Sequence, residues 1–235
     1  MEEYRRLIKP TAGFLAVVLC FPAFCWAGAR TARWGETLTE IEALILDRQY
    51  EQAVLKVADL EEDMLGHIVD GPRVEETLAK VAALYALALA GTGESHHAAW
   101  KWHMAMVFHP PYREFQLGTQ GPAGIELARA LAESQRSEER AGSKQELIVE
   151  PRMIKKEHPR FPQSQRYGRP VLVAIEVVIG KDGVPRDPRI TNSSHKPILV
   201  YLTLDALRQW RFSPAEDEHG PIAVVYPLTV KFKRH

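Results

Sequence analysis

The stretch Val171-Leu172-Val173-Ala174-Ile175-Glu176-Val177-Val178-Ile179 decides the fold of the C-terminal third, because apolar side chains alternate along it. One face collects Val171, Val173, Ile175, Val177 and Ile179. A second run, Ile222 to Phe232, alternates in the same way. A period of two with one uniformly apolar side predicts strands of a sheet that is covered on that side.

The cover is expected from the segment Ile198 to Trp210, which lies between the two runs. Its apolar residues recur at intervals of three and four, as on one face of an amphipathic helix: Leu199, Leu202, Ala206 and Trp210. Asp182-Gly183 supplies turn chemistry for a hairpin after the first strand.

The order of strands follows from the prolines. Pro185 and Pro188 fall at the start of the second strand and donate no ladder hydrogen bond, so this strand should lie at an edge of the sheet. The first strand is then central, and the last strand forms the opposite edge. A free edge can accept an extended peptide by strand addition. The candidate partner-binding residues are Val225, Pro227, Thr229, Lys231 and Lys233. Pro227 removes one donor, which predicts either an interrupted outward ladder or a bulge.

The order of features from Phe161 to Lys233 resembles the C-terminal domain of the TonB family. The residues that carry the resemblance are Phe161-Pro162, Asp182-Gly183-Val184, Ser193-Ser194, Trp210-Arg211-Phe212 with Pro214-Ala215, Gly220-Pro221-Ile222 and Lys231-Phe232. This chain has Phe161 where the family usually has Tyr, and His195 where it usually has Gly. The resemblance implies the same strand arrangement. It also implies that the domain grips a short N-terminal peptide of an outer-membrane transporter.

The N-terminus has the parts of a secretory signal peptide. A basic head precedes an uncharged stretch from Pro10 to Ala29, which closes on the small residues Ala27-Gly28-Ala29. We expect cleavage after Ala27 or Ala29 and a periplasmic mature protein. The alternative is a retained inner-membrane anchor that faces the periplasm, because residues 10–29 are just long enough to span a bilayer.

Composition excludes some classes of function. Both cysteines, Cys20 and Cys25, lie in the predicted signal peptide, so the mature chain would have no disulfide and no thiol nucleophile. Lys+Arg and Asp+Glu balance at 30 each, but residues 148–235 carry 15 basic and 9 acidic side chains, against 15 and 21 in residues 1–147. A basic C-terminal domain suits acidic partners or glycan carboxylates. Alternatively, its positive face lies beside the acidic helical half.

The middle of the chain has helical periodicity from Trp34 to about Glu139. Helices are expected over about 37–46, 50–65, 74–90, 94–108 and 123–139. The second helix pair resembles a tetratricopeptide repeat, with matching small, large and proline positions at Ala86, Ala98, Trp102, Ala105 and Pro110.

Two repeat-like hairpins and a capping helix are one interpretation of this region, and an ordinary helical bundle is the other. Repeats of this kind offer a concave face to a peptide or a partner helix. The candidate residues for helix packing or such a groove are Ala86, Ala98, Trp100, Trp102 and Ala105.

No motif with a chemical mechanism stands out. His96, His97 and His103 share one helix without metal-ligand spacing and are interpreted as surface histidines. Glu61-Glu62-Asp63 is interpreted as a solvated helix face. The chain has neither a glycine-rich phosphate loop nor a Gly-x-Ser-x-Gly elbow, and its basic run at Lys155-Lys156 lacks interleaved aromatic residues. We therefore expect no enzyme, no cofactor, no metal and no nucleic-acid partner.

Together these patterns predict an α+β protein with a signal peptide over 1–29, a tetratricopeptide-like helical domain over 30–140, a linker over 141–150 and a TonB-like domain over 151–235. The expected function is that of a periplasmic adaptor that binds a protein, a peptide or peptidoglycan. The alternative is a membrane-anchored TonB-type energy transducer for outer-membrane transport.

Overall fold

The computed structural model describes residues 29–67, 73–141, 149–159, 170–193 and 196–232. Several sequence predictions lie outside these residues. They concern residues 1–28 of the signal segment, residues 142–148 of the linker, Phe161-Pro162, Ser194, His195 and Lys233.

Five α-helices occupy the N-terminal part of the described chain. They are α2 Ala29–Leu46, α3 Tyr50–His67, α4 Val74–Gly91, α5 Ser95–Phe108 and α6 Gly121–Ala141. The short 3-10 turns η1 Pro110–Glu114 and η2 Leu117–Thr119 connect α5 to α6. These helices match the sequence prediction closely, except that α2 begins eight residues earlier than the expected Thr37. Within the described residues, no helix combines the length and apolarity needed to cross a membrane.

The C-terminal part is the predicted three-stranded antiparallel sheet with one helix. Strands β2 Val171–Ile179, β3 Pro185–Ser193 and β7 Val224–Phe232 are joined in the order β3-β2-β7, and the helix is α7 Pro197–Leu207. Pro197 begins α7, where its missing N–H removes no helical hydrogen bond. The inner face of β2 is buried as the alternation predicts. The α+β fold class and the central position of β2 are thus confirmed.

Two small strand pairs were not predicted. Strand β1 Met153–Lys155 pairs with β4 Arg211–Phe212, and β5 Ala215–Asp217 pairs with β6 Gly220–Ile222. The alternating run that begins at Ile222 is therefore divided at Ala223 between β6 and β7. Only the part from Val224 onward joins the main sheet.

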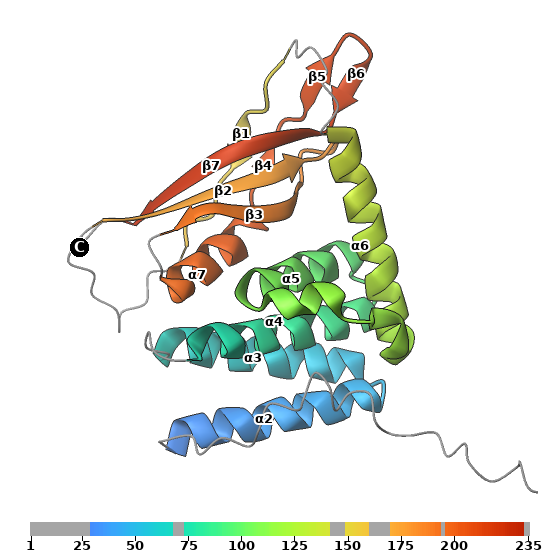
Figure 1. Cartoon of the computed structure of the whole chain (residues 1–235), viewed down its shortest axis with the longest axis vertical. Coiled ribbons are helices and arrows are strands. Elements are labelled where there is room, and N and C mark those ends of the chain that lie inside the picture. The colour runs from blue at the N-terminus through green and yellow to red at the C-terminus, as the bar shows by residue number, and fades with distance from the viewer. Residues whose placement is uncertain (1–28, 68–72, 142–148, 160–169, 194–195, 233–235) are drawn as a thin grey trace, which may run out of the picture.

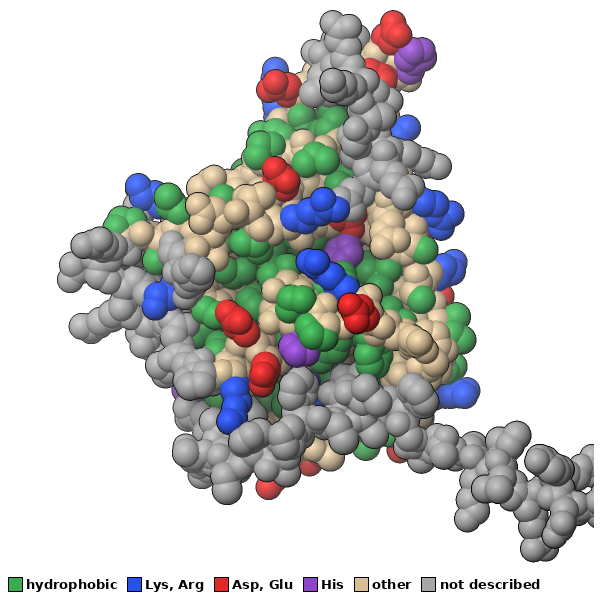
Figure 2. Space-filling view, in the orientation of Figure 1, with side chains coloured by type: hydrophobic (Ala, Val, Ile, Leu, Met, Phe, Trp, Pro, Cys, Tyr) green, Lys and Arg blue, Asp and Glu red, His purple; other side chains and the backbone are tan. Residues whose placement is uncertain are grey.

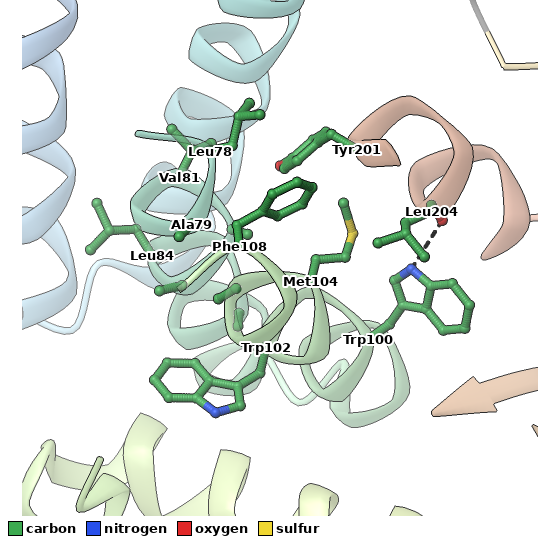
Figure 3. Packing of buried hydrophobic residues seen from close by; sticks show 14 of the residues in the cluster. Leu78, Ala79, Val81, Leu84, Trp100, Trp102, Met104, Phe108, Tyr201 and Leu204 are labelled. Carbon is green, nitrogen blue, oxygen red and sulfur yellow. Dashed lines mark hydrogen bonds between the residues drawn. The ribbon is translucent and has the colours of Figure 1, made fainter. Parts of the chain in front are cut away.

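The elements stack in layers (Figure 1). Helices α2 and α3 lie at one end, α4 and α5 follow, and α7 lies between these helices and the sheet, while α6 stands along one side of the stack. One continuous hydrophobic core runs through all these layers. Figure 3 shows Tyr201 and Leu204 of α7 facing Met104 and Phe108 of α5. The Trp100 indole N–H donates to the Leu204 carbonyl at 3.1 Å. The predicted helix cover of the sheet is therefore itself covered by the helical half.

The β2–β3 turn is tied to the small β1–β4 pair. Gly183 has φ 72°, and its carbonyl accepts a hydrogen bond from the Phe212 amide at 2.9 Å. A Cβ at Gly183 would lie 1.8 Å from the Phe212 carbonyl oxygen. This position therefore needs glycine for both its backbone conformation and its close contact.

We predict that Gly183→Ala destabilises the protein more than Gly93→Ala. Gly93 also has positive φ, at 87°, but a Cβ there would meet nothing within 4 Å. Both changes carry a left-handed backbone cost of about 1–2 kcal/mol, and only Gly183→Ala adds a clash worth about 1–3 kcal/mol. Urea unfolding followed by circular dichroism measures both. Equal losses would show that the contact with Phe212 does not constrain the turn.

Candidate functional site

Strand β7 lies at an edge of the main sheet. It pairs with β2 in an unbroken antiparallel register, from Val171 opposite Phe232 to Ile179 opposite Val224. Among the strands that the structure describes, β7 has no hydrogen-bonded neighbour on its other side. Its outward backbone groups form a row about nine residues long, which is long enough to pair with an extended peptide.

Side chains alternate along β7 as the sequence predicts. Val230 and Phe232 are buried and Val224, Tyr226 and Leu228 are half-buried, whereas the predicted partner-binding residues within the described chain are exposed: Val225, Pro227, Thr229 and Lys231. Val225 is 46% exposed. The exposed row therefore combines an apolar end near Val225 with a basic end at Lys231.

Pro227 lies opposite Glu176, and the register on either side of it continues without a bulge. A proline fits within a ladder only where its nitrogen faces away from the neighbouring strand. The nitrogen of Pro227 therefore faces the free edge. By the period of two, the amides of Val225, Thr229 and Lys231 face the same way. Of the two predicted consequences of Pro227, the structure shows the interrupted outward ladder.

The helical candidate residues Ala86, Ala98, Trp100, Trp102 and Ala105 are all buried, none exposed by more than 2%. Trp102 packs edge-on against Tyr112, with ring centroids 5.2 Å apart. Ala86, Ala98, Trp102 and Ala105 lie in the packing between helices, whereas Trp100 also lines a cavity between α5, α6 and β3. The tetratricopeptide-like interpretation remains a prediction.

A buried polar cluster, which sequence analysis missed, joins the helical half to α7. The Lys101 ammonium of α5 donates to Glu61 Oε1 of α3 at 2.6 Å and to Asp205 Oδ1 of α7 at 3.1 Å. The Tyr201 hydroxyl of α7 also donates to Glu61 Oε1. Arg208 Nε donates to Asp205 at 2.8 Å. The cluster therefore holds three helices together through one ammonium group.

Glu61 corrects a sequence interpretation. The triplet Glu61-Glu62-Asp63 was expected to be solvated, but Glu61 is 9% exposed and Asp63 accepts a hydrogen bond from the Trp34 indole at 2.6 Å. His103, interpreted as a surface histidine, also has a largely buried side chain, 14% exposed, 3.2 Å from Asp187. A single sequence carries no signal for such pairings, because the partners lie far apart in the chain.

Charge states in the cluster follow from burial and attraction. Burial lowers the pKa of Lys101, but the carboxylates of Glu61 and Asp205 outweigh burial and raise it. Burial raises the pKa of Asp205, but Lys101 and Arg208 outweigh burial and lower it to about 2. Burial and the adjacent Glu61 raise the pKa of Tyr201. At neutral pH the cluster therefore holds a charged Lys101 and a charged Asp205 beside a neutral tyrosine.

In the chain that the structure describes, no three His, Cys, Asp or Glu side chains gather closely enough to hold a metal ion. The Lys101 cluster positions helices, and the free backbone edge of β7 is the feature suited to binding a partner.

We predict that Lys101→Met lowers the free energy of unfolding by about 3–5 kcal/mol, because the buried Glu61 loses its ammonium partner and the partly buried Asp205 keeps only Arg208. Lys56→Met is the control, since Lys56 pairs with Glu40 on the surface, where their side chains are 41% and 57% exposed. The control should cost about 1 kcal/mol or less. Urea titration of both variants measures the difference. A loss for Lys101→Met as small as that of the control would contradict the structural role of the cluster.

The depressed pKa of Asp205 predicts a dependence on acid. A group whose pKa falls on folding contributes stability above its unfolded value of 3.8, and that stability is lost as the pH falls toward about 2. The stability difference between wild type and Asp205→Asn should therefore shrink between pH 4 and pH 2. Urea midpoints across this range measure it. A difference that stays constant would refute the assignment.

Comparison with known proteins finds a family match for the C-terminal part of the chain. Residues 157–234 match the family model of the Gram-negative bacterial TonB protein C-terminal region. The match covers β2, β3, α7 and the strands from β4 to β7. A search of curated proteins finds no match to the chain.

Proposed function

Because residues 157–234 form a TonB-type C-terminal domain, we propose that this protein is a periplasmic adaptor that captures an extended segment of a partner protein along β7. The observation that carries the proposal is the free backbone edge of β7, which is hydrogen-bonded to β2 and to no other described strand. Domains of this family act in the cell envelope through interaction and energy transduction, without catalysis of their own. The proposed function is accordingly non-covalent.

The edge sets the pattern of pairing. The amide of Val225 lies on one side of Pro227, and the amides of Thr229 and Lys231 lie on the other. A bound strand would therefore form backbone hydrogen bonds on both sides of Pro227, and it would need no acceptor opposite Pro227 itself. Lys231, with the basic excess of residues 148–235, favours a partner segment that carries acidic side chains. Val225 offers an apolar contact at the opposite end.

The partner class follows from family resemblance and from charge. The resemblance points to the N-terminal peptide of an outer-membrane transporter, and the exposed row on β7 suits such a segment. Peptidoglycan, the alternative partner, is also acidic, but it has no continuous extended peptide backbone that could pair with β7. We therefore favour a protein segment over a glycan.

A second candidate is the membrane-anchored energy transducer, which the family match favours. It needs residues 10–29 to be retained as an anchor and a spacer that extends from the membrane. Helices α2 to α6 instead pack together and against α7 and the sheet, which favours the adaptor. N-terminal sequencing of the protein isolated from the envelope separates the two candidates, since a start near Gly28 or Arg30 excludes the anchored form.

Replacing Thr229 by proline tests strand addition directly. The change removes an outward amide and leaves the pairing with β2 in place, as Pro227 already does. We expect Thr229→Pro to abolish partner capture and Thr229→Ala to retain it, with both variants folded by circular dichroism.

Capture is measured by photo-crosslinking in a Gram-negative envelope. A benzoylphenylalanine at Lys231 should yield a crosslinked protein, and one at the exposed Glu114 should not. A product that survives Thr229→Pro would contradict strand addition. A glycan-linked product would replace the protein partner with peptidoglycan.

A further inference from the structure

A cavity of about 220 Å³ with a mixed polar and apolar lining lies between α5, α6 and β3, away from the β7 edge. Its lining includes Trp100, Ala130, His103, Glu133, Ser134 and Asp187. In Figure 2 a histidine, with basic side chains on either side, lies between the sheet and the helices on the face shown. The cavity lies between the helical half and the TonB-type domain, because α5 and α6 supply one wall and β3 the other.

The position of Asp187 in this wall comes from an irregularity in β3. The register between β2 and β3 shifts between Glu176 and Val178, so Asp187 lies in a bulge, with φ 48°. Aspartate tolerates this conformation better than most residues. The bulge turns the carboxylate toward the helices, where Ser134 donates to Oδ1 and His103 Nδ1 lies 3.2 Å from the same atom.

The second oxygen of this carboxylate has no hydrogen-bond partner within the described part of the chain. Asp187 is 6% exposed, and its Oδ2 is buried without a hydrogen bond. An unsatisfied buried acceptor is costly, more so when it is charged. A donor that reached this oxygen from the cavity would offset that cost.

The neighbouring charges favour a cation as that donor. Arg186, which also lines the cavity, is committed to Asp182 through contacts of 2.8 and 2.7 Å. Burial lowers the pKa of His103, and Arg189 lowers it further, against the attraction of Asp187. Burial, Arg186 and His97 likewise lower the pKa of His96. Both histidines are then neutral at neutral pH, so neither places a positive charge beside the Asp187 carboxylate.

We propose that this cavity binds a small organic ammonium compound, whose charged nitrogen donates to Asp187 Oδ2 and whose apolar body lies against Trp100 and Ala130. The volume suits such a ligand, because an apolar cavity of about 150 Å³ accepts benzene. The ligand would contact both halves of the protein at once. The proposal does not depend on strand addition at β7.

The test compares benzylammonium with benzyl alcohol, which has the same shape without the charge. Titration of the full chain is followed by amide and indole chemical shifts in NMR spectra. Benzylammonium should give saturable shifts at Trp100, His103 and Ser134, and benzyl alcohol should bind about tenfold more weakly or worse.

Three variants sharpen the result. Asp187→Asn keeps the left-handed backbone and the shape, and should remove the preference for the ammonium. Ala130→Leu should fill the cavity and block both compounds. Asp59→Asn, on the exposed face of α3, should change neither. Equal binding of the two compounds, shifts located elsewhere, or a preference that survives Asp187→Asn would overturn the proposal. If Asp187→Asn does not fold, Ala130→Leu still tests where benzylammonium binds, because filling the cavity should abolish its binding.

Discussion

The buried ammonium of Lys101 is the constraint on which the arrangement of the two halves depends. The side chain is 1% exposed, so its charge must be neutralised within the protein. Its own helix supplies no carboxylate to it, and the acceptors come from Glu61 on α3 and Asp205 on α7. The three helices must therefore lie close together around this ammonium for these groups to meet. We infer that the cluster specifies how α7 docks more than it adds net stability, because a buried ion pair also carries a large desolvation cost.

The docking of α7 gives the inner face of the sheet and the β7 edge different roles. The inner face packs on α7, which packs in turn on α4 and α5. The helical half thus covers the apolar side of the domain, which would otherwise be exposed to water. The β7 edge lies outside this packing, although α6 contacts one end of the strand. The packing that supports the sheet and the proposed partner-binding edge therefore occupy separate parts of one domain.

Sequence alone predicted the regular part of the fold because its physical signal is local. The alternation in β2 and β7, the prolines of β3 and the helical spacing of α7 each lie within one short segment. Strands β1 and β4 escaped prediction because three and two residues are too few to show a period. The division at Ala223 escaped it because the alternation continues across that residue, and only the pairing of β6 with β5 reveals the break.

The candidate sites show the same difference between local sequence signals and long-range contacts. The exposed row on β7 follows from periodicity, so the exposure of Val225, Thr229 and Lys231 could be predicted, and their role in partner binding stays a prediction. Lys101 and Glu61 are 40 residues apart, and the acidic triplet that contains Glu61 has the same composition as a solvated helix face. Asp187 faces the helices only because a bulge turns it there. Such sites depend on three-dimensional packing, which single-sequence patterns do not encode.

The short pairing of β1 with β4 has a practical consequence for anyone who excises the C-terminal domain. The family match begins at residue 157, whereas Met153 pairs with Phe212 and Val149 bridges to Glu216. A fragment cut at the family boundary loses both pairings and also uncovers Tyr201, Leu204 and the charged Asp205 on α7. The bared apolar surface would promote self-association. Affinities measured on such a fragment would then include non-specific binding to the exposed apolar surface of α7, so tests of the proposed β7 site need the intact chain.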